Sequence, residues 1–196
     1  MASTCITAAS KARLTNGSTL PHFVRDCCAN NEITRIRYFT ALLTPRPIDP
    51  QQRTRQEIYL RALRTLPNLT IDFGHFLASK QWMMRTDRSE MVQVLKSEEK
   101  GSDVNLASRI LIDSYTSKCD IAVVISNDSD LVFPIEHVKR FLGKIVGIVS
   151  PHPRPSRELQ AVASFFKSIR PSVLGTCQFP DKLTDALGDF HKPPAW

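Results

Sequence analysis

The sequence predicts an α/β domain built around a mainly parallel sheet. Strand-like apolar segments alternate with amphipathic helix-like segments from about residue 33 onward, which is the pattern of parallel strands joined by covering helices. The chain has 196 residues, of which 42% are hydrophobic and 23% charged. This size and mixture suit one globular core and exclude wholesale disorder and fibrous classes.

The first predicted strand and helix lie between residues 35 and 66. Residues 35–43 carry apolar side chains on both faces, which predicts a mostly buried strand. In the helix that follows, Asp49 can act as the N-cap and Pro50 suits the first turn. The apolar residues of this helix recur at spacings of three and four, and they are Ile58, Tyr59, Ala62, Leu63 and Leu66.

The middle of the chain predicts a hairpin and a second helix. Residues 69–77 and 91–95 have the composition of strands and are separated by a polar connection, so we expect them to pair. Residues 102–117 predict a helix with Ser102 as its N-cap.

The alternation continues in the second half. A strand is predicted at residues 121–126, a helix at 131–142 that ends at Gly143, and a strand at 144–149. Ser156 is then expected to cap a helix whose inward side chains are Leu159, Val162, Phe166 and Ile169.

Both ends of the chain lack such periodicity. Residues 1–20 are rich in Ser and Thr and predict a flexible N-terminus, although residues 5–8 are a weak strand candidate. Residues 173–196 contain several prolines without a sustained period and predict an irregular tail. We therefore expect the domain itself to span residues 21–172.

Charge and cysteine content narrow the functional classes. The net charge of +7 and the pI near 9.4 suggest an anionic partner such as nucleic acid, although a merely soluble basic surface is about equally expected. The five cysteines show no zinc or disulfide spacing. No apolar run approaches membrane-spanning length, so we expect a cytoplasmic protein without membrane association. A homo-oligomer is possible.

The most informative stretch is an apolar strand that leads directly into Asp128 and Asp130. Ligands of open α/β sheets bind beyond the carboxyl ends of the strands, which is where these two carboxylates fall. The ordinary alternative is that one is a helix N-cap and the other a turn former. Asp103, at the start of another helix, could join them, and converging hard oxygens are what Mg²⁺ or Mn²⁺ requires. No Gly-rich phosphate loop precedes a helix, which disfavours an NTPase.

Several segments, in this order along the chain, resemble the NYN domain family, a relative of the PIN-type nucleases. The two most specific are EEKGSDVNLA at residues 98–107 and DIAVVISNDSDL at residues 120–131. The likeness covers roughly residues 30–196, and its further segments are residues 31–40, 73–76, 154–159 and 178–185.

The resemblance implies a PIN-like three-layer domain with a mainly parallel central sheet. It also implies hydrolysis of RNA phosphodiesters that depends on Mg²⁺ or Mn²⁺. Carried over by position, Asp103, Asp128 and Asp130 would be the catalytic, metal-binding carboxylates, and Ser126 and Asn127 would shape the strand end beside the RNA phosphate.

Three basic residues are further candidates for contact with the RNA phosphate. Lys100 lies beside Asp103, but a solvated lysine next to two glutamates is an equally good interpretation. Arg154 and Arg157 follow a predicted strand near the proposed cleft, and phosphate contact is about as well supported there as plain solvation.

The sequence departs from the family at its start. Family members usually open with an apolar strand that ends in an Asp-Gly-x-Asn type motif, whose Asp is a principal metal ligand, and nothing here matches that motif. Three explanations are open: the gene model begins late or out of frame, residues 5–8 fill the strand position without the carboxylate, or this version is degenerate. The first strand is therefore expected to be absent or replaced.

Two functional hypotheses follow. The first is a metal-dependent endoribonuclease, and the second is a catalytically impaired module that binds RNA or a protein partner. A phosphatase or nucleotide-sugar enzyme is a distant third, because it would usually need an early nucleophilic Asp that is also missing.

Overall fold

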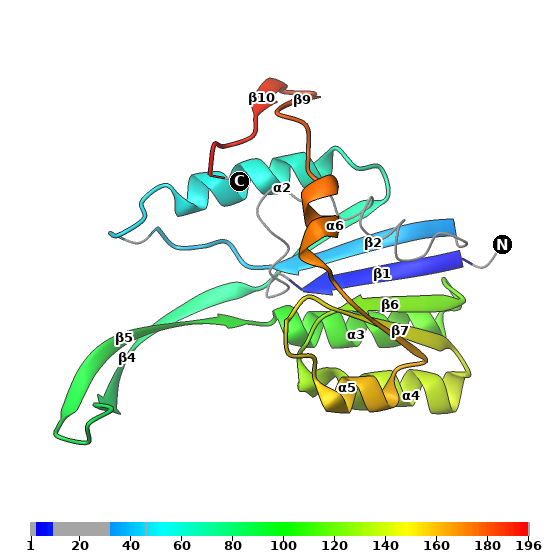
Figure 1. The fold of residues 1–196 in the computed structure, drawn as a ribbon, viewed down its shortest axis with the longest axis horizontal. Coiled ribbons are helices and arrows are strands. Elements are labelled where there is room, and N and C mark those ends of the chain that lie inside the picture. The colour runs from blue at the N-terminus through cyan, green and yellow to red at the C-terminus, as the bar shows by residue number, and fades with distance from the viewer. Residues whose placement is uncertain (1–2, 10–31, 46, 196) are drawn as a thin grey trace.

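A computed structural model describes residues 3–9, 32–45 and 47–195 and has a three-layer α/β architecture. Its central sheet has six parallel strands in the order β3-β2-β1-β6-β7-β8 (Figure 1). The strands are β1 (Ser3–Ala9), β2 (Glu32–Thr40), β3 (Leu69–Phe73), β6 (Ile121–Ile125), β7 (Ile145–Ser150) and β8 (Phe165–Ser168). The predicted α/β class with a mainly parallel sheet is confirmed.

Strand β1 occupies the centre of the sheet, so the first strand is replaced rather than absent. The expectation of a flexible N-terminus was wrong for residues 3–9, whereas residues 10–20 lie outside the described part of the chain. It pairs in parallel with β2 on one side and with β6 on the other. Thr4, Cys5, Ile6, Thr7 and Ala8 are all buried. Among the three explanations, residues 5–8 therefore fill the strand position without a carboxylate. Small and β-branched side chains suffice here because the neighbouring strands pair with both edges of β1.

Helices cover both faces of the sheet. Helix α2 (Gln52–Arg64) and the short α6 (Pro171–Thr176) lie over a core that contains Ile6, Ile36 and Leu63. The opposite face carries α3 (Ser102–Tyr115), α4 (Val132–Leu142) and α5 (Arg157–Val162). Its core side chains are Phe39, Leu106, Ile110, Val124, Ile135 and Ile148. Figure 1 shows α2 on one side of the sheet and α3, α4 and α5 on the other.

The helices predicted at residues 102–117 and 131–142 have nearly the predicted bounds, but two of the predicted caps were wrong. Ser156 caps α5, since its Oγ accepts a hydrogen bond from the Leu159 amide at 3.3 Å, and α4 ends at Gly143 with a φ of 62°. Helix α2 instead begins after Gln51, because Asp49 forms an ion pair with Arg55. The N-cap of α3 is Gly101, whose φ of 89° suits glycine.

The predicted hairpin is longer than expected and projects from the body. It comprises β4 (His75–Met84) and β5 (Met91–Lys100), and we call it the arm. The predicted strand at residues 69–77 is divided at Gly74, where a Cβ atom would lie 2.4 Å from the Lys100 carbonyl oxygen. Beyond their mutual pairing, β4 and β5 make only sparse contacts with other elements, and Figure 1 shows the arm extending past the edge of the domain.

Two expectations near the C-terminus also need correction. Phe166 belongs to strand β8 rather than to a helix, because α5 ends at Val162. The supposedly irregular tail contains α6 and the hairpin of β9 (Lys182–Asp185) and β10 (Gly188–His191). Tertiary contacts that a local pattern cannot reveal hold this hairpin: Arg61 on α2 forms an ion pair with Asp185 at 2.7 Å. Within the described residues, no helix is long and apolar enough to cross a membrane.

Candidate active site at the carboxyl edge of the sheet

The two aspartates after β6 lie at the carboxyl edge of the sheet, next to the end of β1. Asp128 is half-buried and caps the 3₁₀ helix η1 (Ser129–Leu131), since its Oδ1 accepts a hydrogen bond from the Asp130 amide at 3.1 Å. Asp130 is exposed. Ser126 is buried, and its Oγ accepts a hydrogen bond from the Asp128 amide at 3.1 Å. Ser126 therefore holds the turn that presents both carboxylates.

Asn127 joins two loops at this edge, the one after β6 and the one between β7 and α5. Its Oδ1 accepts hydrogen bonds from the Ser150 Oγ at 3.0 Å and the Ser156 amide at 2.8 Å. Its Nδ2 donates to the Arg154 carbonyl at 3.2 Å. The side chain thus ties the end of β6 to the end of β7 and to the start of α5. Sequence reasoning missed Ser150 and Ser156 as its partners, because no local pattern links residues so far apart along the chain.

Asp103 lies near the end of β3. It stands in the first turn of α3, and the close approach of Gly74 to Ser102 places that turn beside the end of β3. Leu106, one turn further on, and Leu131, next to Asp130, belong to the same core cluster. Helix α3 also contacts η1. The elements that carry the three aspartates therefore meet at one side of the sheet, but the three carboxylates do not gather into a group that could hold a metal ion.

Strand β1 brings no carboxylate to the centre of this edge. Ala8 pairs with Ile125 of β6 and with Tyr38 of β2, and its side chain is fully buried. The side chains of Thr4, Cys5, Ile6, Thr7 and Ala8 include no acid, so the central position between β2 and β6 lacks the ligand that the family motif would supply.

The candidate phosphate-binding cations differ in how far their charge is already neutralised. Lys100 pairs with Glu98 at 2.9 Å, and together with Lys96 it lowers the pKa of Glu98 to about 2. Arg154 and Arg157 are exposed, and their guanidinium groups have no ion-pair partner among the residues described. Arg154 and Arg157 therefore offer more available positive charge than Lys100.

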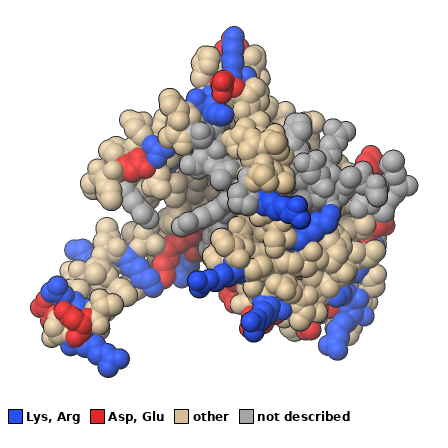
Figure 2. Space-filling view, viewed as in Figure 1, with Lys and Arg blue, Asp and Glu red and all other residues tan. Residues whose placement is uncertain are grey.

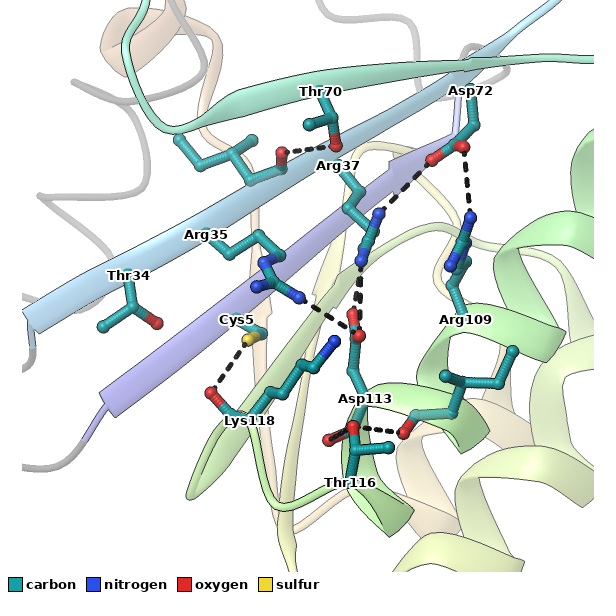
Figure 3. Close-up of polar contacts among 12 residues, drawn as sticks. Cys5, Thr34, Arg35, Arg37, Thr70, Asp72, Arg109, Asp113, Thr116 and Lys118 are labelled. Atoms are coloured by element: carbon teal, nitrogen blue, oxygen red, sulfur yellow. Dashed lines mark hydrogen bonds and ion pairs between the residues drawn. The ribbon is translucent and has the colours of Figure 1, made fainter.

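A network between β2, β3 and α3 engages three further arginines (Figure 3). Arg37 donates from Nε to Asp113 Oδ2 at 2.9 Å, and Arg35 Nη1 lies 3.3 Å from Asp113 Oδ1. Arg37 also approaches Asp72 at 3.7 Å, and Arg109 lies 3.9 Å from the same carboxylate. Because Arg37 and Asp113 are buried, their pairing is structural. Figure 2 shows acidic and basic side chains interspersed across the face in view, without one dominant basic surface there.

A sequence model of the NYN domain matches residues 10–170. The chain belongs to the NYN domain family. Among curated proteins, the 6-hydroxy-3-succinoylpyridine 3-monooxygenase HspA of Pseudomonas putida is 27% identical over 186 residues, which cover 84% of this chain and 58% of that protein. The chain thus spans little more than half of that relative's length.

A solved structure supports the fold of this NYN domain. It is a protein of unknown function from Vibrio parahaemolyticus, which aligns with a TM-score of 0.55 and 18% sequence identity. The alignment covers 87% of this chain and 94% of the Vibrio protein. At that identity the likeness concerns the architecture alone, and it agrees with the three-layer arrangement.

NYN and PIN-like nucleases typically depend on a divalent metal, so the donor set at this edge needs a test of fit. Asp128 and Asp130 supply hard carboxylate oxygens on one short turn. Among the residues that the structure describes, no group of three or more His, Cys, Asp and Glu could hold an ion. Mg²⁺, however, is usually bound by one or two carboxylates together with waters and substrate phosphates. The residues therefore fit an open site that substrate oxygens complete, and they do not fit a closed protein cage.

Proposed function

We propose that this NYN domain is a ribonuclease that hydrolyses RNA phosphodiester bonds with the help of Mg²⁺ or Mn²⁺. The observation that carries the proposal is the position of Asp128 and Asp130 at the carboxyl end of β6, beside the central strand β1. Membership of the NYN family supports a nuclease-like activity in general. The RNA substrate and the metal are the finer parts of the proposal.

Each candidate residue has a distinct task in this mechanism. Asp128 and Asp130 would hold the metal, with Asp103 available from α3, and Ser126 and Asn127 keep the turn in place. Arg154 and Arg157 contact the RNA phosphate next to the cleavage point, and Lys100 assists where its pairing with Glu98 allows. A bound divalent ion supplies a water of lowered pKa and stabilises negative charge on the phosphate oxygens.

A cytoplasmic location is consistent with this role. Cys5 and Cys119 are buried and form no disulfide. Unpaired thiols are typical of reducing compartments, where cellular RNA is also found.

The test is cleavage of labelled single-stranded RNA in the presence of Mn²⁺ or Mg²⁺, with EDTA added in the metal-free control. We expect Asp128→Asn and Asp130→Asn each to lower the cleavage rate by at least about 100-fold, since they remove charge at the metal but keep the side-chain shape. Asp181→Asn is the matched control, because Asp181 is 93% exposed and pairs only with Lys192. Unchanged cleavage by Asp128→Asn would refute the assignment.

One observation favours a second candidate, an impaired NYN domain that binds RNA or a protein without cutting RNA. Ala8 stands where the strand would otherwise approach the metal, which removes a principal ligand. RNA binding that weakens with salt, together with no cleavage at any Mn²⁺ concentration, would support this candidate over the ribonuclease.

A further inference from the structure

The arm carries an exposed apolar strip on one of its two faces. Paired residues of an antiparallel hairpin point to the same side, and so do residues two apart along each strand. The register Met84↔Met91 and Lys80↔Leu95 therefore places Trp82, Met84, Met91 and Leu95 together. They are 63%, 55%, 48% and 73% exposed, and we call them the arm strip.

The arm offers little net charge to an anionic ligand such as RNA. Residues 75–100 carry five Lys and Arg against four Asp and Glu, and Lys80 is the one cation on the face of the strip. Three of the other cations form ion pairs within the arm: Arg85 with Glu90, and Lys96 and Lys100 with Glu98. An isolated two-stranded hairpin is marginally stable in water, so an apolar partner would also stabilise the arm itself. These features favour a protein partner over a nucleic acid.

A second exposed apolar surface lies on the outer side of α3 and α4. Phe133 and Phe141 are 75% and 73% exposed, and both flank the ring of His137. Tyr115 on α3 is 58% exposed, and its Oη lies 2.6 Å from Nε2 of His137. We call these four rings, with the 45% exposed Ile112, the aromatic face.

The arm strip and the aromatic face belong to the same side of the sheet but do not pack together within one chain. Figure 1 shows the arm bending toward the side that carries α3 and α4 while pointing away from them. Its contacts with those helices are at most sparse. A second copy of the chain could present its aromatic face to the arm and receive the first copy's aromatic face on its own arm, as a two-fold axis requires.

The buried area distinguishes this arrangement from simpler ones. From the exposed fractions, each surface offers on the order of 500 Å² of side-chain area, against about 800 Å² per partner in a standard interface. Contact of two arms alone, or of two aromatic faces alone, falls short of that value. A reciprocal contact of arm with face buries on the order of 1,000 Å² from each copy and exceeds it.

We propose that the chain forms a two-fold homodimer in which the arm strip of each copy packs against the aromatic face of the other. This interface lies apart from Asp128 and Asp130 and does not depend on the proposed ribonuclease activity. The expected mass in solution is therefore twice 22.1 kDa at micromolar concentrations.

Two charge-introducing variants test the pairing by analytical ultracentrifugation. We expect Trp82→Glu on the arm and Phe141→Glu on the face each to weaken dimerisation at least tenfold. A mixture of the two variants should form heterodimers more readily than either variant dimerises alone. One of the two arm-to-face contacts is intact in the heterodimer, whereas both contacts are altered in each variant homodimer. Recovery in the mixture is the result that a symmetric arm-to-arm or face-to-face contact cannot give.

Two further variants serve as matched controls. Gln81→Glu adds the same charge on the other face of the arm, and Gln160→Glu adds it on the exposed surface of α5, so both should leave the dimer intact. Circular dichroism and the melting temperature verify the fold of each variant. A monomeric wild-type chain at about 100 μM, or loss of the dimer in only one of the two variants, would overturn the proposal. A monomeric chain whose RNA binding is reduced by Trp82→Glu would also overturn the proposal.

Discussion

At the scale of single residues, the sequence located the carboxylates but not the groups that hold them. Asp128 and Asp130 were predictable because they directly follow an apolar strand, and the N-cap alternative for Asp128 was right as well. The partners of Asn127 were not predictable, since Ser150 and Ser156 reach it only through the fold. Arg37 shows the same limit: its burial against Asp113 depends on the packing of α3 on β2.

We expect Asp113→Asn to be one of the most destabilising substitutions of a polar residue in this chain. It leaves Arg37 buried with a neutral partner, and breaking a buried ion pair costs about 3 to 5 kcal/mol. Urea denaturation measures the change in the free energy of unfolding. Glu57→Gln is the matched control, because its pair with Arg53 is exposed on α2 and should contribute under about 1 kcal/mol. Equal effects of the two variants would contradict the structural role of Asp113.

At the scale of elements, local patterns identified most helices and strands, and tertiary contacts decided the remainder. The segments at 102–117 and 131–142 have clear helical stripes and formed helices close to the predicted bounds. Strand β1 was only a weak candidate, because its stability comes from hydrogen bonding to β2 and β6 rather than from a strongly apolar sequence. The hairpin of β9 and β10 had no local signal, and contacts with α2 fix its place.

The attachment of that hairpin should weaken in acid. The hydrogen bond from Arg61 lowers the pKa of Asp185 to about 2, below the value near 3.9 expected in an unfolded chain. A depressed carboxyl pKa stabilises the fold above about pH 4, and this stabilisation is lost as the pH falls toward 2. We therefore expect Asp185→Asn to lower the melting temperature at pH 5 and to have little effect near pH 2.

The control for this titration is Asp181→Asn in the same segment. Asp181 is exposed and lies 3.5 Å from Lys192, so its replacement should change the melting temperature little at any pH. A destabilisation by Asp185→Asn that is constant from pH 5 to pH 2 would show that the carboxylate charge is not the source of the effect.

At the scale of the whole molecule, the sequence predicted the α/β class and the family, whereas the distribution of charge needed the structure. The net charge of +7 suggested an anionic partner such as nucleic acid. Most of the described arginines in the first half instead have acidic partners, including Arg35, Arg37, Arg55 and Arg61. Overall charge therefore overstates the number of cations available to bind phosphate.

This pairing predicts a shallow salt dependence of RNA binding. If Arg154 and Arg157 supply the main phosphate contacts, the logarithm of affinity should fall with the logarithm of salt concentration with a slope of about −1.4 for single-stranded RNA. Fluorescence anisotropy, measured at salt concentrations from about 50 to 200 mM, gives this slope. Replacing both arginines with alanine should flatten it, whereas Arg53→Ala on α2 should not. A slope steeper than about −4 would indicate a broader basic surface.

The central place of β1 also constrains how a new chain reaches its native state. Residues 3–9 are synthesised before β6, yet Thr4 pairs with Ile121 and Ala8 with Ile125, more than a hundred positions later. The edge of β1 that pairs with β6 therefore stays unpaired until β6 has been synthesised. Such long-range parallel pairing forms slowly. Because β1 is uncharged and contains neither proline nor glycine, it has the composition of an aggregation-prone segment until its partner strands are made.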